Sequence, residues 1–226
     1  MTVNHLPLNA LSCFPVDRGN VTTPCAPPRS GRTAVVEFEN GYLQPRGEYL
    51  HHAIDIWGTI GMPLLAPVDG RVVGAWNGQA MGDAGYWVRF VDLAGYSHYY
   101  SHMNAAPLLT VGATFRAGAQ LGELGQTGNA RRTVPHLHYQ VRGLARRSRL
   151  DRLMGGGQAP PLAEQADGTL DPVSETLLTL AQPDGRNPFN PYRELARLAL
   201  PLGATSNPGG RYFIPAASGG TSPAAP

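Results

Sequence analysis

Residues 131–140 read RRTVPHLHYQ and place two histidines, His136 and His138, one residue apart. In a β-strand, the side chains at positions i and i+2 point to the same face of the sheet. If residues 136–142 are extended, the two imidazoles therefore share one face. The opposite face is apolar and suits a protein core, because it carries Leu137, Tyr139 and Val141. The stretch predicts a strand with a core on one side and two histidines on the other.

Short runs separated by turn residues precede this strand. RVVGAW (71–76) follows the turn-like PVDG, and YWVRFVDLAGYSHYYSHM (86–103) reads as two strands around the turn DLAG. Such spacing is typical of antiparallel β proteins. We expect an all-β fold, mainly antiparallel, with an open barrel or sandwich-like core and a few short peripheral helices in the C-terminal part. PVSETLLTLAQ (172–182) and NPFNPYRELARLALP (187–201) are the helix candidates.

The overall charge does not indicate a nucleic-acid or membrane-surface partner. Charged residues make up 15% of the 226 residues, and the formal net charge is +2. No apolar run approaches the roughly 18 residues of a membrane-spanning helix, so no membrane span is expected. Residues 1–12 lack a basic start followed by a long apolar stretch, so no leader is visible in this sequence.

Cys13 and Cys25 are the only cysteines, and they close a short loop that contains proline and glycine. We expect a disulfide between them, which implies an oxidising compartment. Two unrelated thiols are the alternative.

Six of the seven histidines fall into three pairs, which are His51 with His52, His98 with His102, and His136 with His138. In an extended segment His51 and Asp55 share a face, whereas His52 points away. Four residues of strand span about 13 Å, so His51 and Asp55 can reach one ion only if the chain bends. The small Ala53 between them allows such a bend.

His51, Asp55 and one histidine of the 136/138 pair make a set of two imidazoles and one carboxylate. Three protein ligands with an open fourth position are typical of catalytic zinc, which activates a water at neutral pH. The second histidine of the pair could then act as general base. Other interpretations stay open: the paired histidines can be a surface strand feature, His51 and Asp55 a hydrogen-bonded pair, and His102 a core residue.

The order of the motifs resembles the lysostaphin-type (LytM-like) zinc metallopeptidases, which cut peptidoglycan cross-bridges. Their pattern is H-x-G-x-D, an A-P-x-x-G-x-V strand pair, Y-x-H-L, G-x-x-G-x-T-G and G-P-H-L-H. The matching stretches here are HHAID (51–55), LLAPVDGRVV (64–73), YYSHM (99–103), LGELGQTGNA (121–130) and VPHLHYQV (134–141). NPFNPY (187–192) resembles the segment that ends many such domains.

This resemblance implies a single Zn²⁺ ion held by His51, Asp55 and His138, with His52 as an alternative to His51. It implies that His102 and His136 are catalytic, helping to position and deprotonate the zinc-bound water and to stabilise the oxyanion. Tyr99 and Tyr100 are candidates for lining the substrate groove, with core positions as the alternative.

The chain departs from the family pattern at Ala53, Met103, Val134 and Gln140, and we expect these changes to tune activity rather than abolish it. The expected organisation is an irregular arm (1–33), a peptidase domain (34–200) and a flexible tail (201–226). The domain comprises a core of about 34–143 plus 187–195, and an insertion of about 144–186.

The expected function is that of an exported zinc endopeptidase, in the periplasm, cell envelope or outside the cell, which hydrolyses peptidoglycan stem or cross-bridge peptides through a zinc-activated water. The alternative is a catalytically inactive module of this fold that binds or regulates cell-wall hydrolases, although no ligand is missing here. APVDGRVV also resembles a lipoyl-type carrier, but such carriers need a lysine and this chain has none. The sequence does not indicate which cross-link is cut, or whether the protein remodels its own cell wall or attacks other cells. It also does not indicate the role of the insertion or the oligomeric state.

Overall fold

The computed structural model describes residues 3–18, 35–143 and 188–216. In chain order its strands are β1 (Val36–Phe38), β2 (Pro45–Arg46), β3 (Tyr49–Leu50), β4 (Ile54–Trp57), β5 (Pro63–Leu65), β6 (Gly70–Ala75), β7 (Tyr86–Asp92), β8 (Tyr96–Met103), β9 (Thr114–Phe115), β10 (Gln120–Glu123), β11 (His136–Gly143), β12 (Pro188–Phe189), β13 (Thr205–Ser206) and β14 (Tyr212–Ile214). One α-helix, α3 (Tyr192–Ala199), and two 3₁₀ turns, η1 (Gly128–Arg132) and η2 (Leu200–Leu202), complete the described elements.

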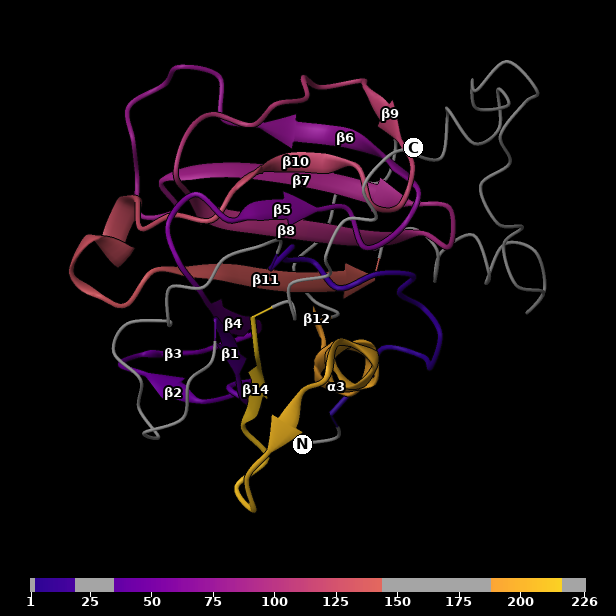
Figure 1. The fold of residues 1–226 in the computed structure, drawn as a ribbon. Helices are drawn as coiled ribbons and strands as arrows, with labels where there is room; N and C mark the ends of the chain where they lie inside the picture. Colours follow the sequence, from indigo (N-terminus) through magenta and orange to yellow (C-terminus); the bar gives the residue numbers. More distant parts are fainter. Residues whose placement is uncertain (1–2, 19–34, 144–187, 217–226) are drawn as a thin grey trace, which may run out of the picture.

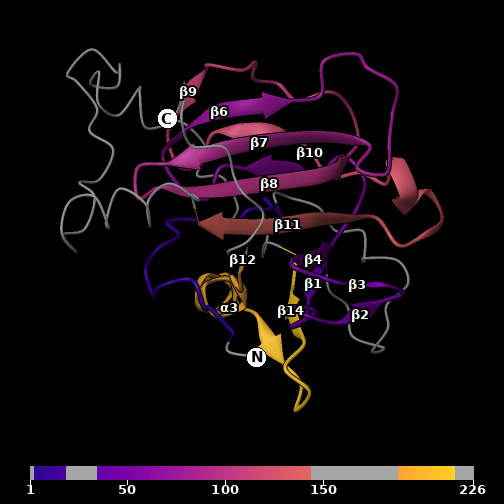
Figure 2. The same ribbon diagram turned by 180° about the vertical axis from the view of Figure 1, so that it is seen from behind.

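Ten strands form one antiparallel sheet in the order β13-β14-β1-β4-β11-β8-β7-β6-β9, with β12 paired to β11 (Figure 1). The pairs β5–β10 and β2–β3 form two small separate sheets. Seen from behind, β11 lies between β8 and β4 and joins the two halves of the large sheet (Figure 2). The prediction of a mainly antiparallel β fold with helical structure near the C-terminus is therefore confirmed.

Strand β11 shows the expected alternation of buried and partly exposed side chains from Leu137 to Arg142, whereas β8 and the end of β7 have runs of consecutive buried residues. Tyr139 of β11 lies opposite Tyr100 of β8, which lies opposite Val88 of β7, and all three side chains are fully buried. The hydroxyl of Tyr100 donates to the carbonyl oxygen of Leu65 in β5 (2.8 Å), so this face packs against the β5–β10 pair. Burial of this face stabilises the sheet by about 25 cal/mol for each Å² of apolar area removed from water.

A buried polar network lies within the core face. His98 is fully buried; its Nε2 donates to Asp92 Oδ2 (3.2 Å), and its Nδ1 accepts from the hydroxyl of Tyr139 (2.9 Å). The backbone N–H of Tyr96 donates to the other oxygen of Asp92 (2.7 Å). Because each ring nitrogen has a partner, burial of this imidazole leaves no unsatisfied group.

Helix α3 begins where the side chain of Asn190 accepts the backbone N–H of Tyr192 (3.0 Å). Its Glu194 is fully buried and accepts hydrogen bonds from the backbone N–H of Leu11 (3.1 Å) and from Arg197 (3.0 Å). The helix therefore fixes part of the irregular N-terminal arm through a charged acceptor rather than through apolar contact alone. The helix expected near residue 172 and the insertion of 144–186 lie outside the described residues.

The expected flexible tail needs one correction. Its first part, residues 201–216, belongs to the fold, because β14 pairs with β1 and Ile214 is fully buried opposite Val36. The tail looked unstructured because its strands are short and separated by Asn, Pro and Gly. No helix within the described ranges is long and apolar enough to cross a membrane.

Candidate metal and catalytic site

Two of the expected ligands face each other across neighbouring strands. His138 of β11 lies directly opposite Asp55 of β4 in the antiparallel pairing. His51 precedes β4, and residues 51–53 are not extended in the sheet, with Ala53 in a bend and fully buried. The chain therefore bends where the sequence allowed it, which brings His51 back to Asp55.

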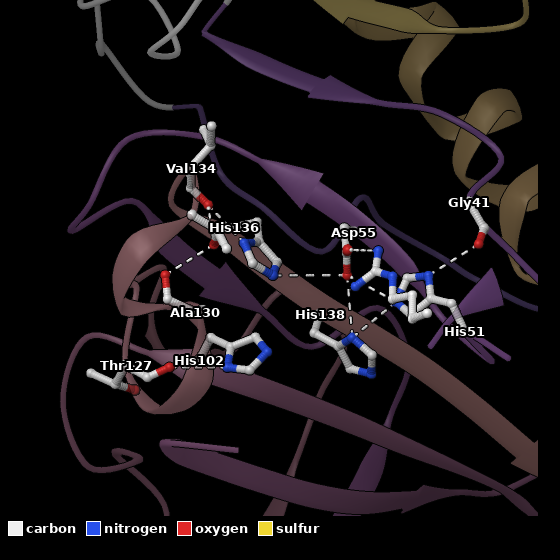
Figure 3. Close-up of polar contacts among 11 residues, drawn as sticks. Gly41, His51, Asp55, His102, Thr127, Ala130, Val134, His136 and His138 are labelled. Carbon is white, nitrogen blue, oxygen red and sulfur yellow. Dashed lines mark hydrogen bonds and ion pairs between the residues drawn. The ribbon is translucent and has the colours of Figure 1, made fainter. Parts of the chain in front are cut away.

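The three candidate ligand atoms form a nearly equilateral triangle (Figure 3). His51 Nε2 lies 3.1 Å from His138 Nδ1, and each of these nitrogens lies 3.2 Å from Asp55 Oδ1. Tetrahedral zinc with ligand distances of about 2.0–2.1 Å has edges of about 3.3 Å between neighbouring ligand atoms. The donor set and its spacing therefore fit one zinc ion with three protein ligands.

A backbone carbonyl orients His51 toward this triangle. Its Nδ1 lies 3.0 Å from the carbonyl oxygen of Gly41, which can only accept, so Nδ1 carries the proton and Nε2 keeps its lone pair for a metal. Such an outer hydrogen bond fixes the tautomer of a metal-binding histidine. His52 is not part of the group; its ring packs near Tyr42, with the ring centroids 6.0 Å apart.

The protonation states suit metal binding. In the metal-free protein, burial would raise the pKa of Asp55, but its contacts with the imidazoles of His138 and His51 outweigh this effect and hold that pKa well below its usual range. Burial lowers the pKa of His138, against the opposing effect of Asp55. At neutral pH the site therefore presents a carboxylate and unprotonated imidazole, the forms that bind metals.

His102 reaches the site through an unusual backbone conformation. Strand alternation would direct it to the same face as the buried Tyr100, but its φ of 63° lies in the left-handed region. Its backbone N–H donates to the carbonyl oxygen of Ala84 (2.8 Å), and its Nδ1 lies 3.0 Å from the carbonyl oxygen of Thr127. A non-glycine residue in this region is uncommon, and such strain collects at functional sites.

The rings of His102 and His136 lie together beside the ligand triangle (Figure 3). Their centroids are 5.0 Å apart, and those of His102 and His138 are 5.8 Å apart. The Nδ1 of His136 lies 2.7 Å from the carbonyl oxygen of Val134, and its Nε2 lies 3.9 Å from Asp55 Oδ1. Both non-ligand histidines therefore donate through Nδ1 to a backbone carbonyl oxygen, which leaves Nε2 as the ring nitrogen that no backbone group engages.

His102 is neutral over a wide pH range. Burial, followed by the nearby His136 and His138, lowers its pKa from 6.5 to about 4, although Thr127 and Asp55 oppose this change. A neutral imidazole with a free Nε2 can accept a proton from a water molecule.

The two tyrosines proposed for the groove occupy different faces. Tyr99 shares the face of the ligands, because it lies opposite Gln140 of β11, and it is partly exposed. Arg89 lies over its ring, with the guanidinium carbon 5.1 Å from the ring centroid. Tyr100 is fully buried in the core, so it does not line a groove in this structure.

His98 is likewise a core residue, which separates it from its sequence neighbour His102.

The thiol of Cys13 lies 2.9 Å from the carbonyl oxygen of Ala66. Its expected partner Cys25 lies outside the described residues, so the disulfide stays a prediction.

Sequence reasoning missed Arg46. Its Nη2 lies 2.5 Å from Asp55 Oδ2, and it is the only arginine in the described residues that forms an ion pair with a ligand of the triangle. No motif signalled this contact, because it depends on the β2–β3 hairpin folding back over the site.

Comparison with known proteins finds one family match. Residues 49–151 match the family model described as peptidase family M23. No curated protein sequence matches the chain.

Among solved structures, the chain is similar to the catalytic domain of the antimicrobial peptidase lysostaphin from Staphylococcus simulans, with 27% identity over 46% of this chain and 76% of that one and a TM-score of 0.40. It is similar to the catalytic domain of the prophage-encoded M23 protein EnpA from Enterococcus faecalis, with 25% identity over 51% and 85% of the two chains and a TM-score of 0.41. It is also similar to a zinc-containing peptidase from Vibrio cholerae, with 24% identity over 59% and 37% and a TM-score of 0.42.

Proposed function

Because residues 49–151 belong to peptidase family M23, we propose that this protein is an exported zinc endopeptidase that hydrolyses peptide bonds in peptidoglycan stem or cross-bridge peptides. One observation carries the proposal. His51 Nε2, Asp55 Oδ1 and His138 Nδ1 lie within 3.1–3.2 Å of one another, and two further histidines stand beside them. The ordered lysostaphin-type motifs of the sequence support the choice of peptidoglycan as substrate.

His51, Asp55 and His138 would hold the ion. When bound, zinc supplies Lewis acidity that makes water a better nucleophile and polarises the scissile carbonyl. The three side chains already have the required spacing, so little reorganisation precedes binding. His51 is held from behind by Gly41, which limits the rotation of its ring.

His102 is the proposed proton acceptor. Its Nε2 is unprotonated, because Nδ1 is engaged by Thr127 and because its pKa of about 4 keeps the ring neutral. After accepting the proton of the attacking water, the imidazolium can pass it to the departing amine. A positioned general base of this kind contributes about 10²–10⁴-fold to a rate.

His136 is the proposed partner on the other side of the reacting carbonyl. Val134 anchors its Nδ1, so its Nε2 faces the ligand side, 3.9 Å from Asp55 Oδ1. Once protonated, that nitrogen can donate a hydrogen bond to the oxyanion of the tetrahedral intermediate. Tyr99 lies on the same sheet face and is the proposed contact for the substrate peptide.

The test is digestion of purified sacculi of defined cross-link type, followed by mass spectrometry of the released peptides. The expected result is release of peptides cut at one type of amide bond, lost on treatment with a chelator and restored by added zinc. Zinc-loaded protein that releases no peptide from any sacculus type would contradict the proposal.

A further inference from the structure

The two carboxylate oxygens of Asp55 have separate partners. Oδ1 belongs to the ligand triangle and lies 3.2 Å from both His51 Nε2 and His138 Nδ1. Oδ2 instead receives a hydrogen bond from Arg46 Nη2 at 2.5 Å. The charge-assisted contact is thus made by the oxygen that the imidazoles leave free.

The hairpin that carries Arg46 is continuous with the first ligand. β2 and β3 pair through Arg46 and Tyr49 around the two-residue loop 47–48, whose Gly47 has a φ of 66°. A glycine at the first loop position is typical of a tight type II′ hairpin. The pairing continues to the ligand, because the N–H of His51 donates to the carbonyl oxygen of Gln44 (2.9 Å). Arg46 and His51 therefore belong to one hydrogen-bonded ladder.

The two partners of the Arg46–Asp55 ion pair differ in their exposure to solvent. The side chain of Asp55 is only 6% exposed, whereas that of Arg46 is 36% exposed. The guanidinium thus approaches from the solvent edge and covers one side of a carboxylate that is otherwise enclosed. Holding a buried carboxylate with a fixed donor restricts its rotation more than a water molecule would.

We propose that Arg46 is a positioning residue that restricts Asp55 to binding the metal through Oδ1 alone. The proposal rests on the zinc site of the proposed function, but not on its substrate. With Oδ2 engaged by Arg46, the protein offers three ligand atoms instead of four, and positions stay open for water and for a carbonyl. The guanidinium also withdraws electron density from the carboxylate, which leaves the metal a stronger Lewis acid.

The experiment uses the full chain loaded with Co²⁺ alone, because the absorption of cobalt reports its coordination number. Four-coordinate cobalt absorbs visible light several-fold more strongly than five- or six-coordinate cobalt. In Arg46→Met, Asp55 gains the freedom to bind through both oxygens, so the visible absorption should fall clearly below that of the wild type. Arg46→Lys keeps a cationic donor and should retain the stronger absorption.

The matched control is Arg116→Met, which removes an arginine that also pairs with an aspartate, Asp69 at 2.9 Å, but is well exposed and has no contact with the ligands. It should leave the spectrum unchanged. A folded Arg46→Met protein with the wild-type spectrum would overturn the proposal. So would loss of cobalt binding in that protein, because Arg46 would then be needed to assemble the ligands rather than to limit one of them.

A second measurement needs no variant. A crystal structure of the zinc-loaded wild type should show Asp55 Oδ1 on the metal and Oδ2 on Arg46, and Oδ2 within coordination distance of zinc would overturn the proposal. Both readouts concern metal geometry alone. A protein with the expected spectra that cuts no sacculus would contradict the proposed function and leave the role of Arg46 standing.

Discussion

His138 stands directly opposite Asp55 across β11 and β4, and its Nδ1 lies 3.2 Å from Asp55 Oδ1. Cross-strand neighbours on one face are the closest side chains that a sheet offers, so backbone pairing alone brings together two of the three candidate ligands. The third candidate ligand, His51, is brought to this pair by the bend at residues 51–53. The predictions below follow from this arrangement.

Substitution of His138 should remove the metal. His138→Ala deletes one of three ligand atoms, so zinc affinity should fall by more than the 10–100-fold typical of lost outer hydrogen bonds to a ligand. Zinc content after dialysis, measured by elemental analysis, checks this. Stoichiometric zinc retained by the folded variant would contradict the ligand assignment.

Substitution of His136, two residues away on the same strand face, should separate chemistry from metal binding. His136→Ala keeps the ligand triangle, so zinc content should stay near that of the wild type while kcat falls by about 10²-fold or more. Peptide release from sacculi, compared with zinc content on the same sample, gives both values. Undiminished turnover with zinc present would exclude the proposed role.

Acid should destabilise the metal-free protein through His102. Its pKa is 6.5 when unfolded and about 4 when folded, so protonation favours the unfolded state. The stability from this residue is fully present above pH 6.5 and is lost as pH falls toward 4, by about 3 kcal/mol at most. Asp55 acts mainly below that window, because its stabilisation is lost as pH falls from the ordinary carboxyl pKa toward its lowered folded pKa.

The measurement is denaturant unfolding of chelator-treated protein at several pH values between 4 and 7. His102→Gln, which cannot titrate, should show a flatter dependence on pH than the wild type. Identical slopes for the two proteins would contradict the lowered pKa.

Gly85 should be needed to hold His102 in place. It has a φ of 65°, and an added Cβ would lie 2.1 Å from Thr127 Oγ1, in the segment whose carbonyl oxygen anchors His102. Gly85→Ala should therefore combine backbone strain of roughly 1–2 kcal/mol with a steric clash of roughly 1–3 kcal/mol, and should lower kcat.

Gly78→Ala is the control for this substitution. Gly78 also has a positive φ, of 92°, but nothing lies within 4 Å of an added Cβ, so only the strain applies. Thermal unfolding and turnover of the two variants are compared. Equal losses in both would show that the contact with Thr127 does not matter.

The sequence predicted the parts of the site that repeat with the strand period. The alternation in β11 placed His136 and His138 on one face and Tyr139 in the core, and the motif order pointed to His51 and Asp55. The sequence could not distinguish the core residue His98 from the site residue His102, because strand alternation places both side chains on the same face of the sheet. The left-handed backbone conformation of His102 itself redirects its side chain, and no local sequence pattern predicts that conformation.

Contacts that depend on tertiary placement were equally out of reach. The pairing of β14 with β1 joins residues about 180 positions apart, so local composition suggested a tail. Tyr100 was a groove candidate because aromatic residues serve both interiors and binding surfaces, and only its burial decides between these roles.

Strand β11 supplies both a wall of the hydrophobic interior and a ligand of the candidate metal site. A shift of β11 against β4 by one position would bring Leu137 to Asp55 and expose the apolar face at the same time. A change that shifts this register therefore destabilises the fold as well as the candidate metal site. We expect most proteins with an insertion in β11 to be unfolded, rather than folded and unable to bind metal. Re-engineering of the substrate preference is accordingly better directed at the segments between strands, which can change in length without disturbing that alignment.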